Sequence, residues 1–201
     1  LSVMLGGYEK VQLFQLTVDR FQAADYTWIG IDHFAKSGDE LAVALAERRL
    51  HRNFMGYATK PAPHMLAFGM SGIGDVCDRF AQNDSDLAGW SGAIDSGRLP
   101  IVKGHILNDD DRLRRLAILN LMCNQELPWS LTEERFGAPA NELLADSLEN
   151  IGPLIEDDVA EMDDQGLRIT PKGRYFVRNV AMILDAYLTG GQERPVFSRT
   201  V

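Results

Sequence analysis

The chain has 201 residues, with a hydrophobic content of 45% and a formal net charge of -9 at pH 7. The negative charge argues against nucleic-acid binding, which needs a basic face. The sequence contains no apolar run of about 18 residues, so no membrane span is predicted. The two cysteines are too few for a disulfide framework or a four-cysteine cluster, and they fit the reducing cytoplasm.

The first 96 residues are predicted to alternate helices with short strands, which is typical of an α/β fold. Local patterns predict, in chain order, a helix over 8–24, a buried strand over 26–31, a helix over 37–49, and strands around 53–58 and 64–70. Ser37 is the expected N-cap of the second helix. A glycine-rich run, Gly69 to Gly74, follows the last strand and requires a tight turn or a close approach of the backbone.

A stretch punctuated by Gly and Pro over 92–104 predicts a boundary between two parts, which we place at 96/97. Residues 97–201 are expected to be mainly helical. The predicted elements there are a helix that begins at Asn108, a helix over 139–150, a hairpin over 159–169, and a helix that begins at Thr170 and Pro171. This order of helices and hairpin is similar to a winged-helix module.

Three motifs carry possible chemistry, and each also has a plain structural interpretation. Asp32 and His33 follow a predicted strand, where they could relay protons or simply form a structural hydrogen bond. Arg52 could bind a carboxylate in a bidentate geometry or lie on the surface. The glycines between Gly69 and Gly74 could let Ile73 contact a flat ring or could only make a turn.

Other patterns in the sequence favour no metal or DNA site. The four histidines are scattered and no C-x-x-C spacing occurs, so no metal-binding motif is predicted. Cys77 and Cys123 are expected to be buried thiols. Acidic residues flank the hairpin at 159–169, which disfavours a DNA-binding wing because they would repel phosphates.

Several short motifs, taken in order, resemble the oxygen-independent coproporphyrinogen III oxidases, the radical S-adenosylmethionine (SAM) enzymes of haem synthesis. The motifs are I-D-H-F-A at 31–35, D-E-L-A-V-A at 39–44, L-H-R-N-F-x-G-Y at 50–57, A-Q-N at 81–83, M-C-N at 122–124, T-x-K-G-R at 170–174 and F-S-R at 197–199. The related haem-chaperone branch typically lacks the H-R-N-F-x-G-Y motif. The chain is therefore identified as similar to the oxidase branch.

This resemblance implies an α/β remnant of a radical SAM partial barrel over 1–96, followed by a mainly α, winged-helix-like C-terminal domain over 97–201. It implies a [4Fe–4S] cluster that cleaves SAM to a 5′-deoxyadenosyl radical, which starts the oxidative decarboxylation of coproporphyrinogen III to protoporphyrinogen IX. The family's C-x-x-x-C-x-x-C motif does not occur in these residues. The chain is accordingly expected to be the C-terminal half of such an enzyme, inactive without its N-terminal catalytic half.

The resemblance also suggests which side chains contact the ligands. Phe54, Met55 and Ile73 match positions that contact SAM in the family, although members often have Gln where this chain has Met55, so only an apolar or backbone contact is implied there. Substrate carboxylates need cationic or polar partners, for which no family position is matched here. The residues expected to bind them are Arg52, Arg115, Arg199 and His33. No metal ligand is expected in this chain.

Two other functions stay open on the sequence alone. The first is a non-catalytic module that binds haem or another tetrapyrrole on the same scaffold. The second is an acidic winged-helix regulator, which the negative charge disfavours.

Overall fold

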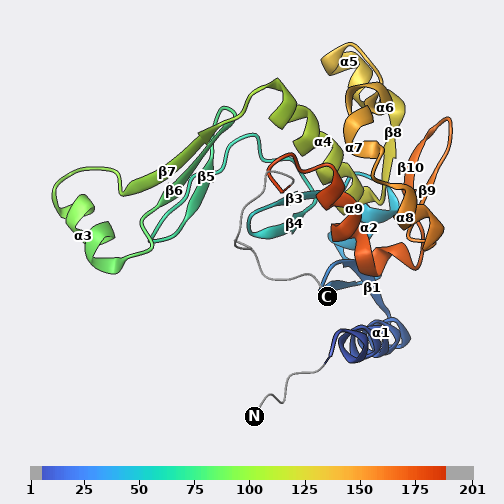
Figure 1. Ribbon diagram of the computed structural model, residues 1–201. Coiled ribbons are helices and arrows are strands. Elements are labelled where there is room, and N and C mark those ends of the chain that lie inside the picture. Colours follow the sequence, from blue (N-terminus) through green and yellow to red (C-terminus); the bar gives the residue numbers. More distant parts are fainter. Residues whose placement is uncertain (1–5, 189–201) are drawn as a thin grey trace.

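The computed structural model describes residues 6–188, which form a mixed α/β body and a long arm that extends from it (Figure 1). The N-terminal elements are α1 (Gly7–Ala23), β1 (Tyr26–Gly30), β2 (His33–Lys36), α2 (Glu40–Ala46), β3 (His51–Asn53) and β4 (Gly56–Ala58). β1 pairs with β2 and β3 pairs with β4, each as an antiparallel hairpin. The helix predicted over 8–24 and the strand predicted over 26–31 are confirmed.

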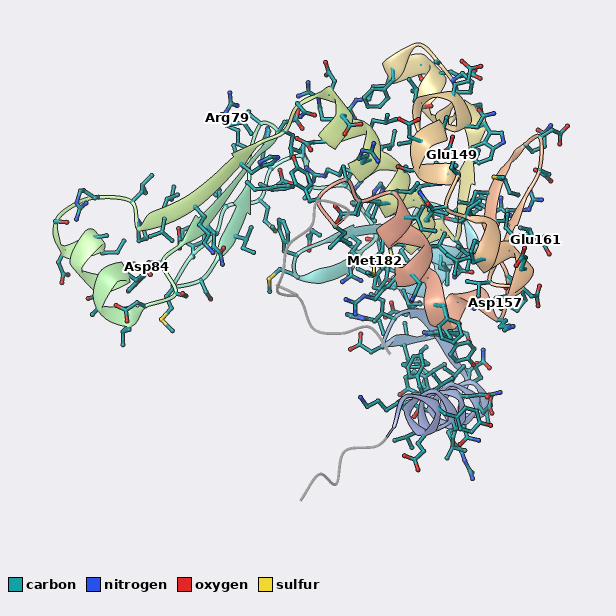
Figure 2. All side chains as sticks on the ribbon, viewed as in Figure 1. Arg79, Asp84, Glu149, Asp157, Glu161 and Met182 are labelled. Carbon is teal, nitrogen blue, oxygen red and sulfur yellow. The ribbon has the colours of Figure 1, made fainter. Side chains whose placement is uncertain are left out.

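The arm is a three-stranded antiparallel sheet with a helix at its far end (Figure 1). Its elements are β5 (Ile73–Asp75), β6 (Arg79–Asn83), α3 (Leu87–Asp95) and β7 (Ile101–Ile106). β6 is the central strand and runs along the arm, with Arg79 at the end near α4 and Asp84, just after it, toward α3 (Figure 2). The predicted boundary at 96/97 falls between α3 and β7, so the pairing of β7 with β6 crosses it.

The rest of the described chain is mostly helical and contains a second three-stranded antiparallel sheet. Its elements are α4 (Asp109–Asn124), β8 (Glu126–Pro128), η1 (Trp129–Thr132), α5 (Glu133–Phe136), α6 (Ala140–Leu143), α7 (Ala145–Leu148), α8 (Gly152–Glu156), β9 (Ala160–Met162), β10 (Gly166–Ile169), η2 (Gly173–Phe176) and α9 (Val177–Ile183). The strand order is β8-β10-β9, and the hairpin predicted over 159–169 is confirmed as β9 and β10.

Helix α4 is the central element because it contributes to both hydrophobic cores. Its buried Leu113, Ala117 and Leu121 join the larger C-terminal core, whereas its buried Cys123 packs with β1, β2 and α2 in a smaller one. The predicted start of α4 is confirmed: the Asn108 side chain accepts a hydrogen bond from the Asp111 N–H at 2.8 Å. Two cores joined by one helix fix the body of the molecule.

Some predicted elements differ from the observed ones because tertiary contacts override local patterns. Helix α2 begins after Asp39, whose carboxylate caps it, since the Ser37 hydroxyl instead donates to Asp25 at 2.8 Å. The segment 64–70 forms only an isolated bridge, Met65 to Asp75. The helix predicted over 139–150 is interrupted at Leu144, which is 1% exposed in the core.

The segment Thr170–Arg174 joins the C-terminal core to the β1–β2 hairpin. The Thr170 hydroxyl accepts from the Gly173 N–H at 2.8 Å, and a 3₁₀ turn precedes α9 where a continuous helix was predicted. A Cβ at Gly173 would collide with the Val159 carbonyl oxygen. Arg174 donates to the Trp28 carbonyl oxygen at 2.6 Å and lies 4.4 Å from the Trp28 ring. This motif of the resemblance therefore serves to hold the fold together.

All strand pairs among residues 6–188 are antiparallel and belong to two- and three-stranded sheets. The described chain is thus mixed α/β, which agrees with the α/β class predicted from the sequence. A barrel strand needs a parallel neighbour, and the strands described here pair only with antiparallel ones. Membership of a parallel barrel would therefore require a neighbouring strand that residues 6–188 do not contain.

Candidate active site

The β1–β2 hairpin and the β3–β4 hairpin lie against each other. The rings of His33 and Tyr57 pack edge to face with their centroids 5.2 Å apart. A Cβ at Gly30 would lie 2.8 Å from Tyr57 Cζ, and a Cβ at Gly56 would lie 3.1 Å from His33 Nε2. Both glycines are needed because the hairpins approach this closely.

His33 begins β2 directly after a tight turn that brings Asp32 beside it. Its Nδ1 lies 2.9 Å from Asp32 Oδ1, and the His33 side chain is 41% exposed. Successive strand residues point to opposite faces, but here Ile31 has a φ of 47°, so the chain reverses and the two side chains meet. His33 Nδ1 is nevertheless buried and makes no hydrogen bond among the described residues, so the carboxylate lies near the imidazole without a directed hydrogen bond to it.

The hydroxyl of partly buried Tyr57 and the thiol of buried Cys123 lie beside Arg52. Tyr57 Oη donates to the Met122 carbonyl oxygen at 3.3 Å, and burial raises the pKa of Tyr57. Burial also raises the pKa of Cys123 to about 12, so the thiol stays neutral and unreactive. Cys123 is buried as predicted, whereas the prediction is wrong for Cys77, which is exposed.

Arg52 lies on the same hairpin and faces Tyr57. Its Cζ is 5.1 Å from the centroid of the Tyr57 ring. The Nη1 atom of Arg52 is buried and has no hydrogen-bond partner among the described residues. A buried guanidinium N–H without a partner costs free energy, and a carboxylate can reach this atom only if the surrounding side chains move.

Phe54 and Ile73 lie on separate elements, and the arm brings them to one region. Phe54 and Met55 occupy the turn between β3 and β4 and are 52% and 87% exposed. The Phe54 ring contacts Phe80 of β6 edge to face, with centroids 5.3 Å apart. Ile73 starts β5, the neighbour of β6.

The register of the arm puts Phe80 and Ile73 on the same face of its sheet. Asp75 is paired with Phe80, which is paired with His105, and Ile73 is paired with Gln82. Residues that pair across strands share a face, as do residues two apart on one strand. This face, defined by Ile73, Asp75, Phe80, Gln82 and His105, is called the ring face below.

Arg115 of α4 reaches the ring face from the body. Its guanidinium forms an ion pair with Asp75, and its Cζ lies 5.2 Å from the centroid of the Phe80 ring. The Asp75 side chain is 11% exposed and that of Arg115 is 35% exposed. Arg115 therefore has an internal partner and also retains N–H groups beside an aromatic surface.

A second polar cluster adjoins the ring face at His105. The Tyr187 hydroxyl donates to Asp111 Oδ1 at 2.8 Å, and His105 Nε2 lies 3.0 Å from Asp111 Oδ2. Burial alone would raise the pKa of Asp111, but hydrogen bonds from the Asn108 backbone, Tyr187 and His105 lower it. The cluster ties the chain at Tyr187 to the N-terminus of α4 and to the arm.

The structure brings some of the predicted site residues together and leaves others apart or undescribed. Phe54 and Arg115 both contact Phe80, and Ile73 shares its face; His33 and Arg52 instead meet at Tyr57. Arg199 lies outside the described residues. Within residues 6–188, no group of His, Cys, Asp or Glu could hold a metal ion, and no helix there is long and apolar enough to cross a membrane.

Sequence reasoning missed Phe80, Asp75 and Tyr187. Alternation along the segment 79–83 could have placed Phe80 and Gln82 on one face. No pattern in the sequence, however, connects Phe80 with Phe54 or Tyr187 with Asp111, since these pairs are distant along the chain.

What the ring face and Phe54 offer is an aromatic and aliphatic surface with the Arg115 guanidinium beside it. Such a surface suits a flat ring, because stacking and edge contacts bury both surfaces. A guanidinium group suits a carboxylate, which it can bind in a bidentate geometry. Neither feature by itself identifies a reaction.

Comparison with known proteins shows which proteins the chain is similar to. The family described as HemN C-terminal domain matches residues 107–176. A protein of Synechocystis named oxygen-independent coproporphyrinogen III oxidase is 37% identical over 197 residues, which cover 96% of this chain and 42% of that protein. Proteins of the same name from Salmonella typhimurium and Helicobacter pylori are each 36% identical over 193 residues.

A solved structure agrees with these relatives. It is described as "Coproporphyrinogen III oxidase (HemN) from Escherichia coli is a Radical SAM enzyme", with a TM-score of 0.87 and 35% identity. The similarity covers 92% of this chain and 42% of that one. The chain therefore spans less than half the length of the relatives that it matches.

Proposed function

We propose that this chain is the C-terminal part of an oxygen-independent coproporphyrinogen III oxidase and serves that reaction as one part of a radical SAM oxidoreductase. The reaction is the oxidative decarboxylation of coproporphyrinogen III to protoporphyrinogen IX in haem biosynthesis. The observation that carries the proposal is a likeness in sequence and fold over more than nine-tenths of the chain. On its own, this chain is expected to be inactive.

The described residues fit SAM but not the iron–sulfur cluster. Half-exposed Phe54, exposed Met55 and Ile73 on the ring face offer an apolar surface to a purine ring. Cluster ligands are mostly thiolates, whereas Cys123 is buried and neutral, Cys77 is a single exposed cysteine, and no group of His, Cys, Asp or Glu within 6–188 could hold a metal ion. When bound, SAM and the cluster supply the radical chemistry. The cluster ligands are expected in an N-terminal catalytic part, the partner of this chain.

The contribution of this chain is to bind and orient. Phe54, Met55 and Ile73 are proposed to contact SAM, with Met55 limited to apolar or backbone contact. The proposed partners of the substrate carboxylates are Arg52, Arg115, Arg199 and His33. Arg52 is supported by its buried Nη1 without a partner, and Arg115 by its place beside the ring face.

The finer statements about fold and location are also proposals. We infer a two-part organisation, with the end of a radical SAM partial barrel over 1–96 and a winged-helix-like domain over 97–201. The three-stranded sheet β8-β10-β9, which shares a hydrophobic core with helix α4, supports the second assignment. Both cysteines are free, which supports a reducing cytoplasmic location.

The first experiment is to read the coding DNA upstream of Leu1 in the source genome. An in-frame segment containing C-x-x-x-C-x-x-C is expected there. A start codon immediately before Leu1 would refute the proposed role as part of a radical enzyme. It would leave the non-catalytic tetrapyrrole-binding module as the function to test.

The second experiment measures SAM binding by the complete gene product that carries this chain, purified without oxygen. Phe54→Ala and Ile73→Ala are expected to raise the SAM dissociation constant, because each removes apolar surface from the proposed contact. Val43→Ala is the matched control: Val43 is a surface aliphatic residue, 39% exposed, on α2. Unchanged affinity in both site variants would refute these SAM contacts.

A further inference from the structure

Phe54 needs a partner to fix its ring, because it lies on a turn and half of its surface is exposed. The turn joins β3 to β4, and the next residue, Met55, is 87% exposed. A side chain on such a turn can occupy several rotamers, and ordering it on ligand binding costs affinity. The Phe80 ring of β6 supplies an edge-to-face contact at 5.3 Å, with the ring planes 78° apart.

Phe80 is itself held from two sides. Val76 and Arg79 exchange two backbone hydrogen bonds of 3.0 Å, so the next pair along the ladder, Asp75 and Phe80, is of the non-hydrogen-bonded kind. Side chains in such pairs are closest together. Arg115 of α4 then covers the Phe80 ring at 5.2 Å and forms an ion pair with Asp75. Body and arm thus hold the ring jointly.

We infer that Phe80 is a positioning residue, held by the Asp75–Arg115 ion pair, that orients Phe54 for contact with the purine ring of SAM. The inference rests on the proposed function and assigns a role to residues that the family motifs did not indicate. Phe80 acts through Phe54, because Arg115 covers its ring and Phe54 contacts it. Phe54 keeps the exposed surface that a ligand can reach.

The test is a double-mutant cycle on SAM affinity in the complete gene product. Phe80→Leu is expected to raise the SAM dissociation constant roughly 2- to 10-fold while Phe54 is present, the range typical of one aromatic pair. In the Phe54→Ala background the same change is expected to have no effect, because Phe80 acts only through Phe54. Phe80→Tyr, which keeps the ring, should restore affinity.

Two further variants separate positioning from general destabilisation. Phe21→Leu is the matched control, since Phe21 also makes an edge contact with an aromatic residue, Tyr26, at 5.2 Å, but on α1. It should leave SAM affinity unchanged. If Phe80→Leu does not fold, Arg115→Gln tests the same arrangement, and it should weaken SAM binding only while Phe54 is present.

The outcomes separate this inference from the function it rests on. Equal weakening by Phe80→Leu in both backgrounds, or none in either, would overturn the positioning role and leave the proposed function intact. Failure of the wild-type protein to bind SAM would overturn both.

Discussion

Replacing Arg174 with Met is predicted to lower the free energy of unfolding, because it removes the contacts that join the β1–β2 hairpin to the C-terminal core. Arg174 donates to the Trp28 carbonyl oxygen at 2.6 Å across 146 residues of chain, and its Cζ lies 4.4 Å from the Trp28 ring. A hydrogen bond from a charged donor contributes about 1.5–3 kcal/mol, and a cation–π contact contributes about 0.5–1 kcal/mol. These terms favour the wild type.

A smaller opposing term comes from burial of the guanidinium. Burial lowers the pKa of Arg174, which shows that the charge loses some hydration in the folded state. Met keeps the apolar stem and recovers that cost. The expected net loss of unfolding free energy is about 2 kcal/mol, which corresponds to a fall in Tm of about 4–8 °C for a chain of this size.

The assay is thermal unfolding followed by circular dichroism. Arg178→Met is the matched control, because Arg178 is an exposed arginine only four residues further along the chain. It should change Tm by less than about 2 °C, as surface substitutions do. If Arg174→Met lowered Tm no more than Arg178→Met, the junction role of Arg174 would be refuted.

Three other predictions concern packing, pH and ligand choice. Gly30→Ala should lower the unfolding free energy by about 1–3 kcal/mol in urea titration, because its Cβ would collide with Tyr57, whereas Gly38→Ala, with open space, should not. Arg168 lowers the pKa of Asp163 from 3.8 to about 2. The stabilisation that charged Asp163 contributes should be complete above about pH 4 and should be lost as the pH falls to about 2. The unfolding free energies of Asp163→Asn and of the wild type should therefore converge near pH 2. Stoichiometric haem should give no Soret shift; a shift would favour the tetrapyrrole-binding module.

Local sequence determined the elements whose signals lie within a few residues of each other. The Asn108 cap and the acidic turn after it fixed the start of α4, because the capping hydrogen bonds join residues three apart. The apolar spacing over 8–24 and the turn residues at 163–166 likewise gave α1 and the β9–β10 hairpin. Short-range interactions suffice in these cases.

The motifs of the resemblance were recognisable in the sequence, but their physical roles were not. Gly56 and Tyr57 were recognisable as part of the motif at 50–57. The structure shows that they let the β3–β4 hairpin pack on His33. Gly173 and Arg174 could be taken for a basic wing, yet one permits close approach to Val159 and the other binds the Trp28 carbonyl. A motif states which residues occur and not what they touch.

Only the tertiary structure decided which residues meet at the ring face. Phe54 and Phe80, Asp75 and Arg115, and Asp111 and Tyr187 are all pairs that lie far apart along the chain. Their contacts depend on how the arm leaves the body and on how α4 packs between two cores. The sequence alone therefore determined the local elements and the family likeness, whereas the site depends on long-range packing, which no local pattern encodes.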